Sequence, residues 1–220
     1  MPQLASTIRS LIHKRNPYDG FDPAPFPLDL QGGGGDPVIT QVVESTGARL
    51  VIEVGSWKGS SAIQMAETLR NRQVDGVVVC VDTWLGGLEH MMDYPGWELH
   101  PYYRNGYPML FYQFLANVMN RGCQDYIVPF PNTSLIGARW FAKQKIQADV
   151  IYVDGSHEED DVYLDLKSYW PILRPGGVLF GDDWNTTWYG VICAVNRFAR
   201  ELSLEIHHSP NRWILHKPGN

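Results

Sequence analysis

Short hydrophobic runs and longer mixed segments alternate along most of this chain. The runs are rich in β-branched residues and are bounded by Gly, Pro or Asp, which is typical of buried parallel strands. They lie at residues 49–55, 76–82, 125–130, 148–154 and 176–182. Each is followed by a segment with helical character, at residues 60–71, 107–121, 134–143, 158–173 and 189–201. This alternation predicts a parallel sheet covered by helices on both faces.

The pattern changes at the C-terminus. Strand-like runs at residues 202–208 and 212–218 are separated only by "SPN". Because so short a connection cannot hold a crossover helix, we expect the last strand to run antiparallel as a hairpin partner. The whole pattern predicts a single α/β domain with a mostly parallel, seven-stranded sheet and an antiparallel last strand.

Two segments fall outside this rhythm. Residues 1–37 are expected to form an N-terminal helix and a Pro/Gly-rich stretch ahead of the main domain at 38–220. The run Gly32 to Gly35 in that stretch is interpreted as a flexible linker or a flap. Residues 86–107 are too long for a routine connection and carry many aromatic residues, which favours a lid over a substrate pocket or an interface between two copies of the chain.

Composition narrows the possible partners and location. A formal net charge of −6 and a pI near 5.6 argue against binding to nucleic acid or anionic lipid. No stretch has the roughly 20 apolar residues of a membrane span. Cys80, Cys123 and Cys193 lack metal-ligand spacing, so we expect free thiols and a cytoplasmic location.

The strand ends carry the candidate chemistry, because ligands of open α/β sheets bind beyond the carboxyl ends of the strands. The first strand runs into "EVGSWKGSS", where Gly55 and Gly59 would let a ligand approach the backbone. This stretch is neither the G-x-G-x-x-G of dinucleotide folds nor a P-loop. The second strand ends at Asp82, an acid that can accept the two hydroxyls of a ribose. A loop glycine and a helix cap are the alternative interpretations.

Three carboxylates follow two strands that a single helix connects. Asp154 ends one strand, and Asp182 and Asp183 end the next. If the strands are neighbours, these side chains meet and repel each other unless a hard divalent cation compensates them. Helix-cap and turn roles for these aspartates are the alternative.

The stretch "VIYVDGSHEEDD" combines two signals. Ser156 with Glu159 matches a capping box, so part of this acidic cluster is expected to start a helix. His157 would then lie in the first helical turn, where the helix dipole favours the neutral imidazole of a general base and the nearby carboxylates oppose it. A structural histidine is the alternative.

Four of these stretches together resemble a known family. "VIEVGSWKGSSA", "VVCVDTW", "DVIYVDGSH" and "LRPGGVLFGDDW" look like the successive motifs of class I S-adenosylmethionine-dependent methyltransferases. The last two resemble the metal-dependent O-methyltransferases such as catechol O-methyltransferase, and the Asp-x-x-His form is closer to the macrolide-sugar O-methyltransferases and the cephalosporin hydroxylase-like group. The resemblance implies a Rossmann-like class I methyltransferase fold with S-adenosylmethionine as cofactor.

The resemblance also implies roles for individual residues. Cofactor contacts would come from Glu53, Gly55 and Ser61 to the methionine part, Asp82 to the ribose and Ser134 to the adenine, with Ser56, Trp57, Gly59, Thr83, Trp84 and Asp154 in the same site. Asp154, Asp182 and Asp183 would hold Mg²⁺ or another divalent cation. His157 would be the catalytic base, and Asp154 would lie between metal and cofactor. Catechol O-methyltransferase has Lys where His157 stands and Asn at Asp183, and the macrolide-sugar enzymes carry extra N-terminal sequence, which leaves the substrate open.

The sequence thus favours a metal-dependent O-methyltransferase acting on a hydroxylated small molecule, such as a sugar, a phenol or a polyketide. A metal-independent methyltransferase, a nicotinamide-dependent oxidoreductase and a non-enzymatic cofactor-binding scaffold are the alternatives. A homo-oligomer is compatible with the aromatic segment.

Overall fold

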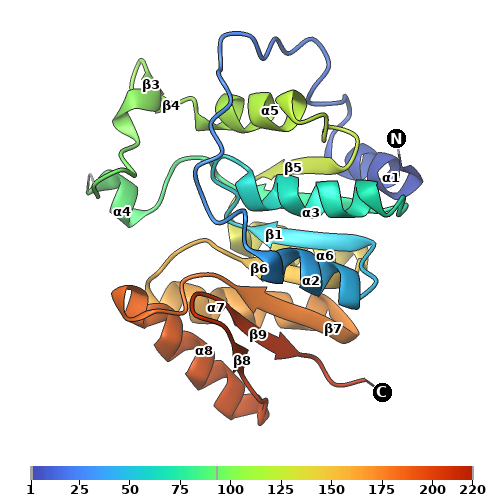
Figure 1. Cartoon of the computed structure of the whole chain (residues 1–220), viewed down its shortest axis with the longest axis vertical. Helices are drawn as coiled ribbons and strands as arrows, with labels where there is room; N and C mark the ends of the chain where they lie inside the picture. The colour runs from blue at the N-terminus through green and yellow to red at the C-terminus, as the bar shows by residue number, and fades with distance from the viewer. Residues whose placement is uncertain (1, 93, 220) are drawn as a thin grey trace.

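A seven-stranded sheet organises the chain, whose computed structural model describes residues 2–92 and 94–219. In this described part the order across the sheet is β5 (Ile127–Pro131), β2 (Val77–Asp82), β1 (Leu50–Val54), β6 (Ala148–Val153), β7 (Leu173–Gly181), β9 (Trp213–His216) and β8 (His207–His208). The five strands from β5 to β7 run parallel, and β9 is antiparallel to both of its neighbours (Figure 1). The predicted mostly parallel sheet with an antiparallel last strand is confirmed.

Successive side chains of each strand enter two separate hydrophobic cores. In β1, Leu50, Ile52 and Val54 face one core, and Val51 faces the other. The first core is closed by α1 (Gln3–Ile12), α6 (Ser134–Gln144), α7 (Glu159–Tyr169) and α8 (Tyr189–Leu202). The second is closed by α2 (Pro37–Ser45), α3 (Ser60–Asn71) and α5 (Leu110–Asn120). Helices therefore cover both faces, as predicted for a single α/β domain.

Two helices differ from expectation. The helix α2 was not predicted, although Asp36 caps it by accepting the amide N–H of Val38 and Pro37 occupies its first turn. The preceding glycine run concealed this start signal. The helix α7 ends earlier than predicted, at Tyr169, because Pro171 cannot continue it, and a 3₁₀ turn (Trp170–Ile172) leads into β7.

The Pro/Gly-rich stretch packs against the domain along a defined path. Asn117 of α5 is fully buried; it donates to the carbonyls of Asp29 (2.6 Å) and Lys58 (2.8 Å) and accepts the amide N–H of Asp29. The ammonium of Lys58 in turn lies 2.6 Å from the carboxylate of Asp29. A Cβ atom on Gly34 would lie 2.8 Å from the backbone of Ser60, so a side chain has no room there. We therefore interpret residues 29–36 as an ordered strap and not as a linker.

The stretch from Gly86 to Pro108 is called the lid segment below, after one of the two roles expected for it from the sequence. It contains α4 (Leu88–Met91), a 3₁₀ turn (His100–Tyr102) and the hairpin of β3 (Tyr103–Arg104) with β4 (Tyr107–Pro108). The hairpin and α4 lie together on the left of Figure 1. Leu99 is buried, whereas Leu88, Met91 and Met92 are exposed.

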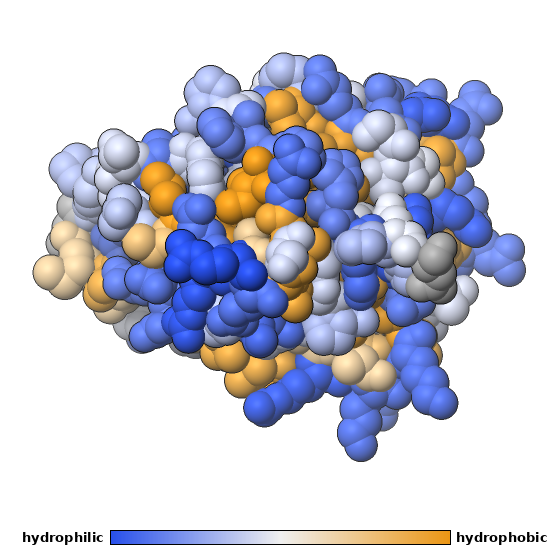
Figure 2. Space-filling model, turned by 90° about the horizontal axis from the view of Figure 1, so that it is seen from below, coloured by the Kyte–Doolittle hydropathy of each residue, from blue (hydrophilic) through white to orange (hydrophobic). Residues whose placement is uncertain are grey.

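The outer surface is mixed in character. Hydrophilic residues cover most of the face seen in Figure 2, with hydrophobic patches between them. Within the described residues, every helix is too short or too polar to cross a membrane.

The packing of the strap against the domain should depend on Asn117. Asn117→Ala removes its hydrogen bonds and leaves buried backbone groups unpaired, so we expect a loss of about 2–4 kcal/mol in the free energy of unfolding and faster proteolysis within residues 16–36. Urea denaturation and limited proteolysis measure both. Asn196→Ala, on the exposed face of α8, should change stability by less than about 0.5 kcal/mol. Equal proteolysis of the two variants would contradict the anchoring role of Asn117.

Candidate active site

Two cavities adjoin at the carboxyl ends of the parallel strands. The larger has a volume of about 650 Å³ and the smaller about 280 Å³. The two share wall residues, namely Trp57, Glu89, His90, Asp154 and Gly155. This is the position at which open α/β sheets bind their ligands.

The loop after β1 separates the strand from α3 by a sharp turn. Gly55 has φ 82°, and a Cβ atom there would collide with the backbone of Asp154. Gly59, at φ 85°, precedes the first turn of α3, and Trp57 holds an unusual left-handed conformation for a bulky residue, at φ 46°. Such strained positions concentrate at functional sites. Ser56, Trp57 and Ser61 line the larger cavity, and Gly55 lines the smaller one.

Asp82 holds this loop as well as facing the smaller cavity. Its carboxylate accepts the amide N–H of Ser56 (2.8 Å), of Trp57 (2.9 Å) and of Trp84 (2.7 Å). Burial raises the pKa of Asp82, against the effect of these hydrogen bonds. A carboxylate offers about four acceptor positions. Asp82 therefore retains capacity for one more donor, and accepting both hydroxyls of a ribose would require it to release a backbone N–H.

Glu53 lies beneath the loop and not in either cavity. It is fully buried, and it accepts a 2.5 Å hydrogen bond from the hydroxyl of Ser61. Burial raises the pKa of Glu53 to about 7. Its second oxygen has no hydrogen-bond partner among the described residues. Glu53 thus supports the loop from below.

The other expected cofactor residues divide into two groups. Thr83 and Ser134 line the smaller cavity. Asp165 lines the same cavity, and burial raises its pKa to about 6. Trp84 is placed differently from expectation: it is buried against Phe111 and Phe114, and its indole N–H donates to the carbonyl of Trp57. Because it lines neither cavity, we assign Trp84 to the hydrophobic core.

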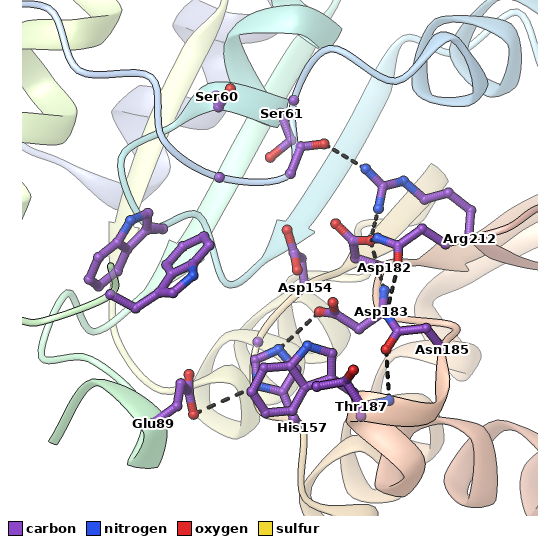
Figure 3. Close-up of a pocket in the computed structure, with 18 of the residues that line it drawn as sticks. Ser60, Ser61, Glu89, Asp154, His157, Asp182, Asp183, Asn185, Thr187 and Arg212 are labelled. Atoms are coloured by element: carbon purple, nitrogen blue, oxygen red, sulfur yellow. Dashed lines mark hydrogen bonds and ion pairs between the residues drawn. The ribbon is translucent and has the colours of Figure 1, made fainter. Parts of the chain in front are cut away.

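The three aspartates meet in the larger cavity, as the neighbouring positions of β6 and β7 require (Figure 3). One oxygen from each of Asp154, Asp182 and Asp183 lies within 4.8 Å of the others. Burial and the charge of Asp183 raise the pKa of Asp154 to about 6. Asp183 reaches this position through a left-handed conformation, φ 65°, which Asp tolerates better than most residues.

Neutralisation of this cluster by the described residues is incomplete. The guanidinium of Arg212 forms an ion pair with Asp182, and the amide of Asn211 donates to the same oxygen. The hydroxyl of Tyr152 lies 3.2 Å from both Asp154 and Asp182. Three carboxylates against the guanidinium of Arg212 and the imidazole of His157 leave oxygen ligands and a net negative charge suited to a hard divalent cation, so these residues fit a Mg²⁺ site.

His157 bridges two acidic groups in Figure 3. Its Nε2 lies 2.9 Å from Asp183, its Nδ1 lies 3.6 Å from Glu89, and its ring stacks on Trp188 at 3.9 Å. Burial lowers the pKa of His157, but the two carboxylates outweigh it and raise that pKa to about 9. The sequence left the balance between helix dipole and carboxylates open, and in the structure the carboxylates dominate.

The predicted capping box of Ser156 with Glu159 is wrong. The helix α7 begins at Glu159 with Glu158 as its N-cap, so His157 precedes the helix. The hydroxyl of Ser156 accepts the amide N–H of Glu158 and donates to Asp161. The motif thus forms a different local turn from the one its spacing indicates.

Several site residues were not singled out from the sequence. Arg212 and Asn211 come from the C-terminal hairpin, Glu89 from the lid segment and Gly33 from the strap. A Cβ atom on Gly33 would lie 2.7 Å from both Asp154 and Asp182, so the strap crosses directly above the carboxylates. The tetraglycine run was the signal available for this approach, since only glycine fits so close to other groups.

The family of this chain follows from a comparison with known domains. A family model described as "Methyltransferase domain" matches residues 52–184, more than half of the chain. The chain therefore belongs to the methyltransferase domain family. No curated protein matches it significantly.

Solved structures agree with the fold. An O-methyltransferase from Bacillus cereus in complex with SAH aligns with a TM-score of 0.60 at 16% identity, over 98% of this chain and 96% of that one. TomG from Streptomyces achromogenes, an O-methyltransferase in complex with SAM, aligns at 0.60 and 14%, over 98% and 96%. CalS11, described as a TDP-rhamnose 3'-O-methyltransferase, aligns at 0.59 and 16%, over 82% and 77%. At these identities the likeness shows the Rossmann-like methyltransferase fold.

Burial of Glu53 predicts a pH-dependent stability. Its pKa is about 7 in the folded chain against an ordinary value of 4.5, so its stabilising effect is complete below pH 4.5 and is lost as the pH rises through 7. Glu53→Gln lacks this titration. We expect the stability difference between variant and wild type to shift by about 3 kcal/mol in favour of the variant from pH 4.5 to 8, measured by urea denaturation. Glu44→Gln, at an exposed site, is the control. Parallel stability curves for Glu53→Gln and wild type would count against the burial argument.

Proposed function

We propose that this chain is an S-adenosylmethionine-dependent O-methyltransferase that uses a divalent cation to activate a hydroxyl group of a small molecule. One observation carries the proposal: the cavity beside Asp82 and the loop after β1 shares a wall, Asp154, with the cavity that holds the three carboxylates. A methyl donor and a metal-bound hydroxyl would therefore meet at Asp154. Membership of the methyltransferase family and the SAM- and SAH-bound neighbours support the same conclusion.

The chain's own residues supply binding and proton transfer in this proposal. Asp82 and the backbone of the loop after β1 would hold the ribose and methionine parts of the cofactor, and Ser134 would contact the adenine. A divalent cation on Asp154, Asp182 and Asp183 would lower the pKa of the substrate hydroxyl. His157, once it has released its own proton, would accept the hydroxyl proton at Nε2. Bound S-adenosylmethionine would supply the methyl group to the substrate oxygen, with S-adenosylhomocysteine as the other product.

The walls of the larger cavity suit a ring-shaped, hydroxylated acceptor. Trp57, Trp97 and Trp188 offer flat apolar surfaces, and Asn185 and Thr187 offer hydrogen bonds. A sugar, a phenol or a polyketide fits this chemistry, and the described activity of CalS11 on TDP-rhamnose gives the sugar a precedent.

A metal-independent methyltransferase is the second candidate. The observation in its favour is the ion pair between Arg212 and Asp182, since a guanidinium already neutralises part of the cluster. Removal of metal distinguishes the two candidates.

Asp82 provides the test of cofactor binding. Asp82→Ala strands the ribose hydroxyls and releases the loop, so we expect S-adenosylhomocysteine to bind about 10- to 100-fold more weakly, a loss of about 1–3 kcal/mol. Titration calorimetry measures the dissociation constant. Asp160→Ala removes an exposed acid and serves as the control. An unchanged constant in Asp82→Ala, or no binding by the wild type, would overturn the cofactor assignment.

Metal dependence is tested by methyl transfer to a panel of hydroxylated compounds, followed by mass spectrometry. We expect EDTA to abolish turnover and Mg²⁺ to restore it. Asp154→Asn and Asp182→Asn should be nearly inactive, whereas Asp183→Asn should retain some activity because the amide oxygen can still bind the cation. Asp160→Asn is the matched control. Full activity in chelator would establish the metal-independent alternative.

A further inference from the structure

Glu89 links the lid segment to the site. It belongs to α4, lines both cavities, and its side chain is only 13% exposed. Its carboxylate points toward His157 in Figure 3. Neither the strand-end motifs nor the proposed cofactor and metal contacts give this acid a role.

The carboxylate of Glu89 approaches the imidazole of His157 without a hydrogen bond. Among the described residues, Nδ1 of His157 has no hydrogen-bond partner, and Oε1 of Glu89 has none either, although it lies 3.0 Å from Nδ1 of His90. The closest approach of Nδ1 to the carboxylate, 3.6 Å to Oε2, is too long for a hydrogen bond. His90 does not resolve this, because its Nδ1 accepts the amide N–H of Gly87 (2.9 Å) and so cannot donate to Glu89 from the same atom. A buried polar atom without a hydrogen bond costs free energy. A small movement that brings the carboxylate of Glu89 and Nδ1 of His157 together is therefore favourable.

The remaining contacts of His157 determine how a hydrogen bond from Nδ1 to Glu89 would affect the imidazole. Stacking on Trp188 fixes the plane of the ring, and Asp183 holds its Nε2 side. A carboxylate that accepts the Nδ1 proton fixes the tautomer and the direction of Nε2, which is how buried acids orient catalytic histidines. Less than about 1 Å of movement turns the present distance into a hydrogen bond.

The lid segment connects Glu89 to the cofactor side of the site. Gly86, at φ 84°, begins it, and on the cofactor side His90 stacks on Trp57 at 4.1 Å. Binding of the cofactor at Trp57 would therefore shift His90 and with it α4, the helix that carries Glu89.

We propose that Glu89 is a positioning residue: when the lid segment closes on bound cofactor, Glu89 accepts the Nδ1 proton of His157, and Nε2, no longer donating to Asp183, is aimed at the substrate hydroxyl. This inference rests on the proposed function, in which His157 is the base. It makes proton removal conditional on closure, so that the base is correctly aimed only when the lid covers the site.

A crystal structure with S-adenosylhomocysteine and Mg²⁺ tests the contact without any methyl acceptor. The expected result is a Glu89–His157 distance within normal hydrogen-bond range, near about 2.8 Å. A carboxylate turned to solvent, or a distance that stays beyond hydrogen-bond range, would overturn the proposal whether or not the chain transfers methyl groups.

A double-mutant cycle tests the effect on turnover. His157→Ala should lower kcat by about 10²–10⁴-fold, and Glu89→Ala by about 10- to 100-fold with little change in KM. In the His157→Ala background, Glu89→Ala should cost nothing further, because it acts through His157. Glu89→Gln keeps an acceptor oxygen and should recover much of the rate, and Glu98→Ala in the same segment should leave it unchanged.

The outcomes separate the two proposals. Independent, multiplicative losses in the cycle would reduce Glu89 to a structural role in the lid while leaving the methyltransferase assignment intact. A wild-type enzyme that methylates no acceptor would count against the proposed function, and the crystal structure would still decide whether Glu89 binds His157.

Discussion

Mutual repulsion among acidic side chains is the constraint on which the rest of this site depends. Parallel strands end at the same edge of a sheet, so Glu53, Asp82, Asp154 and the Asp182–Asp183 pair are crowded together by the topology itself. Each is compensated differently: Glu53 by protonation, Asp82 by backbone N–H groups, and Asp182 by a guanidinium. Asp183 is paired with the imidazole of His157, which leaves Asp154 the least compensated and concentrates unbalanced charge where the two cavities join.

The sequence predicted the parts of the structure that local pattern controls. Alternating β-branched runs located the strands, and the short "SPN" connection implied the antiparallel end. Convergence of Asp154 with Asp182 and Asp183 was predictable because one helical crossover places two successive strands side by side. These inferences needed only the period of the pattern and the length of each connection.

What the sequence did not predict depends on contacts between distant segments and on energy balances. Nothing local to Arg212 or Glu89 indicates that each lies beside a residue of another strand end. The direction of Trp84 into the core depends on Phe111 and Phe114, far along the chain. For His157, helix dipole and carboxylates oppose each other, and only the measured separations, 2.9 Å and 3.6 Å, show which effect prevails.

The strap has a consequence for engineering of acceptor specificity. Gly33 and Gly34 look like a permissive, low-complexity stretch, yet any side chain there would meet carboxylates or backbone. Libraries that seek new substrates should therefore hold these positions fixed. Tyr94 and Thr187 are better positions to randomise, because each lines the larger cavity and is exposed, which leaves room for other side chains.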